Sequence, residues 1–400
     1  MKKFMSMALA GLMALSLAAC GSSSAASSAA ASTEAAASTE AAASTEAAAA
    51  ETTDMKVAMV TDYGDITDQS FNQTTYEACK KFAEDNGLEF NYYKPATDAD
   101  ADREASIDQA VSEGYNVVVM PGYAFAKAIV DEAPLYPDVK FVALDVSQYD
   151  LDTASGTENW TASQPNVYSA IYQEELAGYM AGYAAVKLGY KKLGFLGGMA
   201  VPAVIRYGFG YVQGADAAAA ELGLTDVSIN YVYGGQFFGD ADITAVMDTW
   251  YQGGTEIVFA CGGGIYSSAA EAAVKTGGKV IGVDVDQKGT IDGAYGDGIT
   301  VTSAMKGLAA TVNTLLSAIK DGKWADYSGK IENLGIISDD PSENYVQLPD
   351  DTQWADGFTQ DDYKALVAKL HSGEIKVDNN TEAMPAVTTV TVDDQGSIKG

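Results

Sequence analysis

The stretch KVAMVTDYGDITDQSFNQ, residues 56–73, decides the fold class of this 400-residue chain. Its opening run of apolar residues is typical of a strand that is covered on both faces. Asp62 follows at the carboxyl end of this strand, which is where open parallel sheets bind their ligands. A helix is then predicted to begin at Phe71, with Asp68 or Ser70 as its N-cap. We therefore expect Asp62 and Phe71 to face the same crevice, where a carboxylate beside an aromatic ring can recognise a ligand.

Strand and helix patterns alternate along the rest of the chain. Strands are predicted at residues 89–93, 117–120, 140–144, 192–196, 228–232, 256–260, 279–283 and 299–302, with a further extended run at 335–338. Helices are predicted at residues 102–113, 170–188, 203–222, 267–276, 306–320 and 358–370. Because helices of ten or more residues separate the strands, the pattern predicts an α/β protein with parallel sheets and right-handed crossovers.

The strands fall into two series, which predict two doubly wound parallel-sheet lobes with a break at residues 157–166. We expect lobe 1 to comprise residues 55–160 and a later segment near 290–320. Lobe 2 is expected to comprise residues 166–288 and the C-terminal elements, up to residue 400. A chain that crosses between the lobes more than once gives them a shared, multi-crossing hinge, and the cleft between the lobes is then the expected ligand site.

The first 20 residues have the features of a bacterial lipoprotein signal peptide. Lys2 and Lys3 precede an apolar run that is too short for a convincing membrane span, and small residues stand immediately before Cys20. We expect cleavage before Cys20 and a diacylglycerol on its sulfur, which would hold the protein on the extracytoplasmic face of the bacterial cell membrane. The alternative is an ordinary secretory signal in which Cys20 is incidental.

Residues 21–54 form a low-complexity stretch of Ala, Ser, Thr and Glu with STEAAA-like units. The stretch has no aromatic and no large aliphatic residue, so it cannot bury a core. We expect a passive linker that gives the anchored protein reach, about 30 Å as a coil or about 50 Å as a helix.

Charge and residue counts exclude several classes of function. The formal net charge of −31 argues against nucleic acid as a partner, because its phosphates would be repelled. His371 is the only histidine, and Cys79 and Cys261, expected to be buried free thiols, are the only cysteines after Cys20. The sequence therefore has too few histidines and cysteines for a zinc cluster or for a nucleophile that is activated by histidine. The sequence motifs of phosphate loops, dinucleotide-binding folds and nucleophile elbows are also absent. We expect neither an enzyme nor a cofactor nor a metal site.

A glycine run, Gly262 to Gly264, stands between a predicted strand and a predicted helix. Its backbone N–H groups could cradle an anion. The favoured alternative is a tight turn that lets the backbone approach a ligand, because no lysine or arginine accompanies the glycines. Gly263 is accordingly a candidate binding residue.

Polar residues at strand ends recur downstream and carry a family resemblance. Asp284 ends a strand in IGVDVDQ, Lys306 follows another in TVTSAMKG, and Asp145 ends FVALD. Together with DxGxxxDxSFN at residues 62–72, these motifs resemble the basic membrane protein family. That family comprises lipid-anchored solute receptors of ABC importers, similar to the bacterial purine-nucleoside receptors. The resemblance runs from about residue 55 to at least residue 320 and implies the type I periplasmic-binding-protein fold.

The resemblance implies that a nucleoside is held between two aromatic rings, of which Phe71 matches the first. The second ring falls in residues 235–240, where the sequence departs from the family pattern by one residue. Counting forward from Gly235 selects Phe237, and counting back from Asp240 selects Phe238, which we favour because it keeps Asp240 in register with the helix.

The resemblance also assigns the polar candidates. Asp284 matches the carboxylate that accepts from the ribose hydroxyls, and Lys306 matches an ammonium that donates to the nucleoside. Asp62 and Asn72 match groups at the base edge, and Asp145 is a further cleft residue. The chemistry is suitable, since stacking stabilises a base by about 1–3 kcal/mol per ring. Each hydrogen bond to a carboxylate adds about 1.5–3 kcal/mol. A phosphate dianion beside these carboxylates would be repelled, so nucleotides should be rejected.

Each candidate also has a purely structural interpretation. Phe71 could be an apolar staple at the start of a helix, Asp284 a turn or helix cap, and Lys306 a solvated lysine of a first turn. Their joint occurrence at strand ends favours a binding site.

We therefore expect a monomeric, lipid-anchored receptor that closes on a nucleoside and hands it to the permease and ATPase subunits of an ABC importer. The alternatives are a sugar-binding receptor of such an importer and a surface sensor that no longer transports.

Overall fold

The structure is a computed structural model that describes residues 54–62 and 64–399. The predicted signal peptide, Cys20 and all of the predicted linker except residue 54 lie outside the described residues. Within the described part, no helix is long and apolar enough to cross a membrane.

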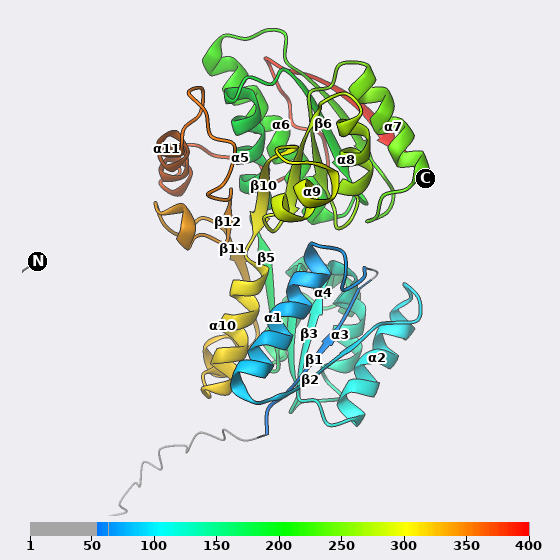
Figure 1. The fold of residues 1–400 in the computed structure, drawn as a ribbon. Helices are drawn as coiled ribbons and strands as arrows, with labels where there is room; N and C mark the ends of the chain where they lie inside the picture. Colours follow the sequence, from blue (N-terminus) through cyan, green and yellow to red (C-terminus); the bar gives the residue numbers. More distant parts are fainter. Residues whose placement is uncertain (1–53, 63, 400) are drawn as a thin grey trace, which may run out of the picture. The chain divides into compact units, whose positions relative to one another are not determined.

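The first sheet is formed from six strands of the described residues, all paired in parallel. Their spatial order is β11 (Lys330–Leu334), β5 (Val167–Tyr172), β4 (Lys140–Leu144), β3 (Val117–Pro121), β1 (Lys56–Val60) and β2 (Glu89–Tyr93). The helices around it are α1 (Phe71–Asn86), α2 (Asp100–Ser112), α3 (Ala126–Glu132), α4 (Gln148–Ser155) and α10 (Leu308–Lys320) (Figure 1). This sheet and these helices are called lobe 1 below.

The strand β1 shows why this sheet is doubly wound. Val57 packs into the core cluster that contains Phe82 of α1 and Leu315 of α10. Its neighbour Ala58 packs into the opposite cluster, which contains Ile107 of α2. Because successive side chains of a strand point to opposite faces, the continuous apolar run of β1 buries both faces of the sheet.

The second sheet is formed from seven strands of the described residues, of which only β12 is antiparallel to its neighbour. Their order is β12 (Val346–Gln347), β10 (Thr300–Lys306), β9 (Lys279–Asp284), β8 (Ile257–Cys261), β6 (Lys192–Gly197), β7 (Ser228–Tyr233) and β13 (Thr391–Ser397). Its helices are α5 (Glu174–Lys187), α6 (Pro202–Leu222), α7 (Ala241–Gln252), α8 (Tyr266–Val274), α9 (Lys288–Tyr295) and α11 (Gln360–His371). This sheet and these helices are called lobe 2. Short 3₁₀ turns lie at Tyr123–Phe125, Trp160–Ser163, Trp324–Asp326 and Pro341–Glu343.

The prediction of two doubly wound parallel-sheet lobes is confirmed, but the sheets divide the chain at other points than expected. The strand β5 begins at residue 167 and lies in lobe 1, although we expected lobe 2 to start at residue 166. Of the later segment near 290–320, α9 and β10 belong to lobe 2, and only α10 belongs to lobe 1. The error arose because β5 runs into α5 through a single polar residue, Gln173, so that the two looked like one helix.

Among the described residues, three segments cross between the lobes, which confirms the predicted multi-crossing hinge. They are Gln173, between β5 and α5, Gly307, between β10 and α10, and residues 335–345, between β11 and β12. The segments are hydrogen-bonded to one another, since Gly307 N donates to Tyr345 O (2.7 Å) and Gln173 N donates to Leu334 O (3.0 Å), the residue just before the third segment. The hinge is therefore a single connected unit.

Lobe 2 also contains an unusually close helix pair, α5 and α6. Each helix carries two glycines four residues apart, Gly178 and Gly182 on α5 and Gly210 and Gly214 on α6. A Cβ atom at any of these positions would lie 2.0–2.1 Å from a backbone oxygen of the other helix. Glycine is required here because the two backbones are in direct contact.

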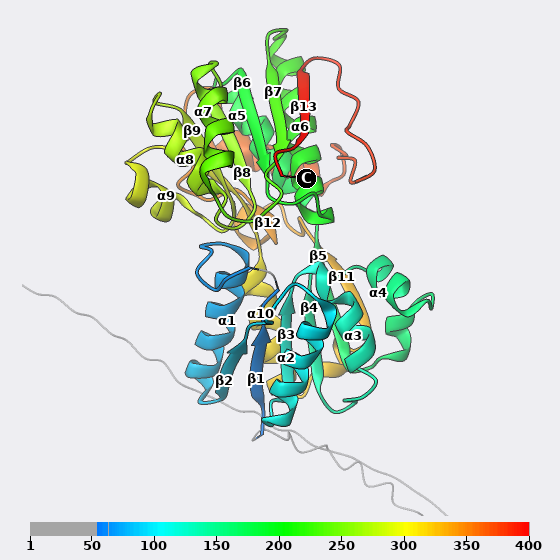
Figure 2. The same ribbon diagram turned by 90° about the vertical axis from the view of Figure 1, so that its right-hand side faces the viewer.

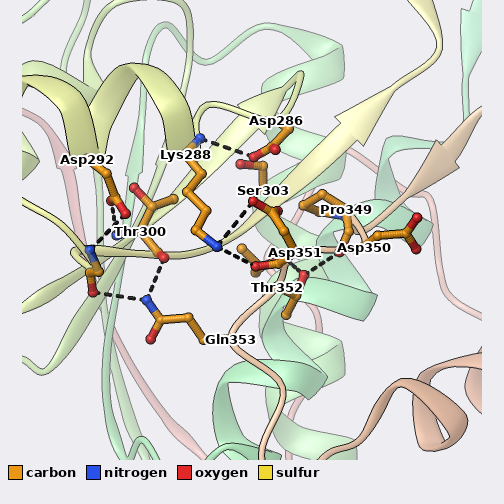
Figure 3. A network of polar contacts seen from close by, with 12 residues as sticks. Asp286, Lys288, Asp292, Thr300, Ser303, Pro349, Asp350, Asp351, Thr352 and Gln353 are labelled. Atoms are coloured by element: carbon orange, nitrogen blue, oxygen red, sulfur yellow. Dashed lines mark hydrogen bonds and ion pairs between the residues drawn. The ribbon is translucent and has the colours of Figure 1, made fainter.

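After the third crossing, polar contacts fix the chain to lobe 2 (Figure 3). Lys288 Nζ donates to Asp351 O (2.6 Å), and its ammonium pairs with the Asp351 carboxylate at 3.1 Å. Gln353 Nε2 donates to Thr300 O at 2.7 Å. Residues 351–353 therefore belong to the same rigid unit as β10, the strand that ends in Lys306.

Candidate functional site

A cavity of about 580 Å³ is lined by residues of both lobes. Its walls come from the carboxyl ends of parallel strands, as the sequence led us to expect. All nine candidates line it: Asp62, Phe71, Asn72 and Asp145 from lobe 1, and Phe237, Phe238, Gly263, Asp284 and Lys306 from lobe 2. The structure thus brings the candidates together, and their roles toward a ligand stay a prediction.

Asp145 and Asp284 occupy equivalent places in the two lobes. Asp145 follows β4 and Asp284 ends β9, and both have a left-handed backbone, with φ of 65° and 64°. Each begins the same short motif, aspartate-valine-any residue-glutamine. Aspartate tolerates this backbone better than most residues. The two aspartates line one cavity because each lobe turns its chain in the same way at this strand end.

Lys306 is the central cation of the cavity. Its Nζ donates to Asp145 Oδ2 at 2.6 Å and to Glu174 Oε1 at 3.1 Å, and it lies 4.9 Å from the centre of the Phe71 ring. Burial alone would lower the pKa of Lys306, but the surrounding carboxylates of Asp145, Glu174 and Asp284 raise it. Lys306 is therefore a permanent charge rather than a solvated lysine, and it bridges the two lobes.

Glu174 is a buried partner that the sequence did not reveal. It begins α5, and it accepts from Lys306 with one oxygen and from Arg206 Nε (2.7 Å) with the other. Burial raises the pKa of Glu174, but the attraction of Arg206 and Lys306 outweighs it and lowers the pKa overall. We missed Glu174 because residues 170–188 were predicted as one helix, which hid its position at a strand end.

The carboxylate of Asp145 is less well stabilised by neighbouring cations than that of Glu174. Burial raises its pKa to about 6, against the lowering effect of Lys306. Its Oδ1 atom is buried and has no hydrogen-bond partner in the described part of the chain. This oxygen is therefore available to accept from a ligand.

Asp284 of lobe 2 is hydrogen-bonded to Ser70, which precedes α1 of lobe 1. Ser70 Oγ donates to Asp284 Oδ2 at 2.6 Å, and the Tyr207 hydroxyl lies 3.5 Å from Oδ1. Burial raises the pKa of Asp284, and Lys306 and Ser70 oppose the rise. Ser70 stands at the N-cap position of α1, but its side chain makes no capping hydrogen bond and holds Asp284 instead.

The side chain that caps α1 comes from Asp68, whose carboxylate accepts from the backbone N–H groups of Ser70, Asn72 and Gln73 at 2.9–3.0 Å. This cap orients Asn72, whose Nδ2 donates to Asp62 Oδ1 at 3.0 Å. Asn72 Oδ1 is buried without a partner in the described residues, and burial raises the pKa of Asp62 to about 6. One wall of the cavity therefore offers acceptors whose hydrogen-bonding capacity is not exhausted.

The two neighbouring phenylalanines of lobe 2 differ in their packing. A Cβ at Gly198 would lie 2.4 Å from the Phe237 ring, so this ring rests directly on glycine backbone. The Phe237 carbonyl accepts from Gly264 N at 2.9 Å, and a Cβ at Gly263 would lie 2.9 Å from that carbonyl oxygen. Phe238 is 50% exposed and has a free ring surface. The glycine run thus serves as a turn on which Phe237 is seated.

Groups for metal or thiol chemistry do not gather at this site. Among the described residues, no three or more His, Cys, Asp or Glu side chains are arranged to hold a metal ion. Cys79 and Cys261 are buried free thiols, as predicted, and burial raises the pKa of both.

Comparison with known proteins identifies the family. The model of the Bmp family, described as ABC transporter substrate-binding protein PnrA-like, matches residues 55–380. The chain belongs to this family. The resemblance to basic membrane proteins that the sequence motifs indicated is therefore confirmed.

Individual Bmp relatives are moderately similar in sequence. The ABC transporter nucleoside-binding protein BmpA of Lactococcus lactis subsp. cremoris (strain MG1363) is 28% identical over 289 residues, which cover 68% of this chain and 77% of that protein. An uncharacterized lipoprotein of Pyrococcus abyssi (strain GE5 / Orsay) is 25% identical over 300 residues, covering 72% of this chain and 68% of the relative.

The fold agrees with that of solved solute-binding proteins. The crystal structure of an ABC transporter system solute-binding protein from Aeropyrum pernix K1 aligns with a TM-score of 0.64 at 21% identity, covering 82% of this chain and 94% of that one. The predicted type I periplasmic-binding-protein fold is confirmed. As a Bmp protein, the chain is a substrate-binding protein of an ABC transporter, a role that implies a ligand and a permease and is not enzymatic.

Proposed function

We propose that this protein is a monomeric, lipid-anchored receptor that binds a purine nucleoside in the cavity between its lobes and delivers it to the permease. The observation that carries the proposal is the composition of the cavity. It combines aromatic rings from both lobes with buried polar groups, of which Asp145 Oδ1 and Asn72 Oδ1 have no hydrogen-bond partner among the described residues. A nucleoside presents a flat base for the rings and adjacent hydroxyls for a carboxylate.

Within this proposal, Phe71 and Phe238 stack on the base, and Asp62 and Asn72 contact its edge. Phe238 is chosen over Phe237 because Phe237 is already seated on Gly198, whereas half of the Phe238 surface is free. Asp284 accepts from the ribose hydroxyls. Asp145 accepts through its unpartnered oxygen, and Lys306 donates from between its carboxylates.

Two further findings support the proposal. The Lactococcus relative carries the name of a nucleoside-binding protein, and the Pyrococcus relative carries the name of a lipoprotein. The second name agrees with the small residues that precede Cys20. Closure of the lobes would exclude water around Asp284 and strengthen its hydrogen bonds, and it would form the surface that a permease recognises.

Calorimetric titration with inosine, guanosine, adenosine, free bases, sugars and nucleotides tests the ligand class. We expect nucleosides to bind, and Phe71→Ala or Asp284→Ala each to weaken binding about tenfold or more, since each lost interaction is worth about 1–3 kcal/mol. Phe237→Leu should weaken nucleoside binding less than Phe238→Ala does. Unchanged affinity in the first two variants would refute the site, and binding of sugars alone would favour a sugar receptor.

Cell fractionation tests the anchor. The full-length protein should sediment with membranes, and Cys20→Ala should release it, because the acyl chains would be lost with the thiol. Retention of Cys20→Ala on the membrane would contradict the lipid anchor.

A further inference from the structure

The C-terminal strand β13 extends lobe 2 beyond the family match. It pairs in parallel with β7, and its residues 391–397 follow the last matched residue, 380 (Figure 2). The carboxylate of Asp216 accepts from the backbone N–H groups of residues 388, 389 and 390 at 2.7–3.1 Å and so fixes the start of the strand. Most side chains of β13 are exposed, so the strand adds little to the core.

The strand leads directly to the loop that carries two aromatic residues of the cavity, Phe237 and Phe238. This loop, residues 234–240, follows β7, and Ile398 N donates to Tyr233 O at 2.8 Å just before it. A Cβ at Gly235 would lie 2.6 Å from Lys399 O, so the two backbones are in contact. Lys399 Nζ donates to Gln236 Oε1 at 3.1 Å and pairs with the Asp240 carboxylate.

The partners of Lys399 determine the shape of this loop. Gln236 Nε2 donates to Phe238 O and to Asp240 Oδ2, both at 2.9 Å. Asp240 Oδ1 accepts from the backbone N–H groups of Asp242 and Ile243, which begin α7. Lys399 is therefore connected to the backbone of Phe238 through a single side chain, that of Gln236.

We propose that β13 positions the ring of Phe238 for ligand binding and that Lys399 is the positioning residue. This inference rests on the proposed function of the cavity. Lys399 does not line the cavity, so it acts through Gln236 and Asp240 rather than on the ligand. The C-terminal segment would thus tune affinity in a way that the matched family region does not contain.

Lys399→Ala tests the proposal, with Lys275→Ala as a matched control. Lys275 pairs with Asp248 of α7, the helix that Asp240 caps, and the two ion pairs have similar exposure: 34% and 27% for Lys399 and Asp240, 43% and 28% for Lys275 and Asp248. Of the two pairs, only Lys399 with Asp240 contacts the loop of residues 234–240. We expect Lys399→Ala to weaken inosine binding about fivefold or more, with Lys275→Ala unchanged and Lys399→Arg restoring most of the affinity.

A double-mutant cycle separates positioning from general stability. In a Phe238→Ala background, Lys399→Ala should have no further effect, because the ring that it positions is gone. An equal loss in both backgrounds, or an equal loss in Lys275→Ala, would overturn the proposal.

Amide hydrogen exchange of the ligand-free protein gives a test that does not depend on the ligand. The amides of residues 234–240 should exchange about tenfold faster in Lys399→Ala and at the original rate in Lys275→Ala. Unchanged exchange overturns the positioning role whatever the protein binds. Faster exchange in a protein that binds no nucleoside would instead contradict the proposed function and leave the loop contact supported.

Discussion

At the residue scale, the adjacent Glu174 and Glu175 are both buried but differ in their partners. Glu174 is bonded to Lys306 and Arg206, which lower its pKa despite its burial. One oxygen of Glu175 is buried without a partner in the described chain, and burial raises the pKa of Glu175 to about 7. The first carboxylate should stabilise the folded protein at neutral pH, and the second should not.

We predict that Glu174→Gln lowers the free energy of unfolding at pH 7 by about 3–5 kcal/mol, because two buried cations lose their shared carboxylate. A lowered pKa gives stability that is present above the unfolded pKa and is lost as pH falls through the folded value. The difference from the original protein should therefore shrink on acidification. Urea unfolding at several pH values measures it.

Glu175→Gln is the matched control. A raised pKa means that the ionised form opposes folding, so at pH 8 this variant should be as stable as the original protein or more stable. A large loss in Glu175→Gln, or none in Glu174→Gln, would show that the charge balance around Lys306 is not as described.

The four charged residues that the sequence predicted share one property. Asp62, Asp145, Asp284 and Lys306 stand directly at strand ends, and such positions can be recognised without knowing how the strands assemble. Ser70 is bonded to Asp284 from the loop before α1, and Arg206 is bonded to Glu174, a partner of Lys306, from a helix face. Their roles depend on how the lobes meet, which no local pattern contains.

At the element scale, two edge strands that the sequence missed, β11 and β13, are polar, whereas the missed strand β5 is buried and was merged with α5. The strands β11, KIENL, and β13, TVDDQGS, lie at sheet edges, with β11 partly and β13 mostly exposed, and neither has the apolar run that identified β1. The close packing of α5 on α6 is, by contrast, indicated in the sequence by glycines four residues apart on both helices. Repeated small residues at this spacing leave one side of a helix open to a neighbouring backbone.

Gly210→Ala tests this helix contact. Its Cβ would lie 2.1 Å from the backbone oxygen of Glu175, so the helices must move apart, at a cost of about 1–3 kcal/mol. Gly293→Ala in α9 is the control, since its Cβ would meet no atom within 4 Å and alanine favours helix by about 0.5–1 kcal/mol. Thermal unfolding should show a lower Tm for the first variant and an equal or higher Tm for the second.

At the scale of the whole molecule, contacts outside the candidate ligand residues also join the lobes. Gln69 stands in the loop before α1 of lobe 1, and its carbonyl accepts from Gln287 Nε2 at 3.0 Å. Its side-chain oxygen accepts from Thr290 Oγ1 of α9 at 3.2 Å. Lobe contacts of this kind stabilise the arrangement that encloses the cavity, whichever ligand it contains.

Thr290→Val separates lobe contact from ligand contact. The variant keeps the shape of the side chain and loses one neutral hydrogen bond between the lobes, worth about 0.5–1.5 kcal/mol. Since this bond forms only when the lobes meet, we expect ligand dissociation to become about 2–10-fold faster while association stays within about twofold. Stopped-flow measurement of both rates is the test.

Thr276→Val, which loses a bond to Ala273 O within lobe 2, should change neither rate. Slower association with unchanged dissociation in Thr290→Val would mean that Thr290 acts before closure, on the open protein.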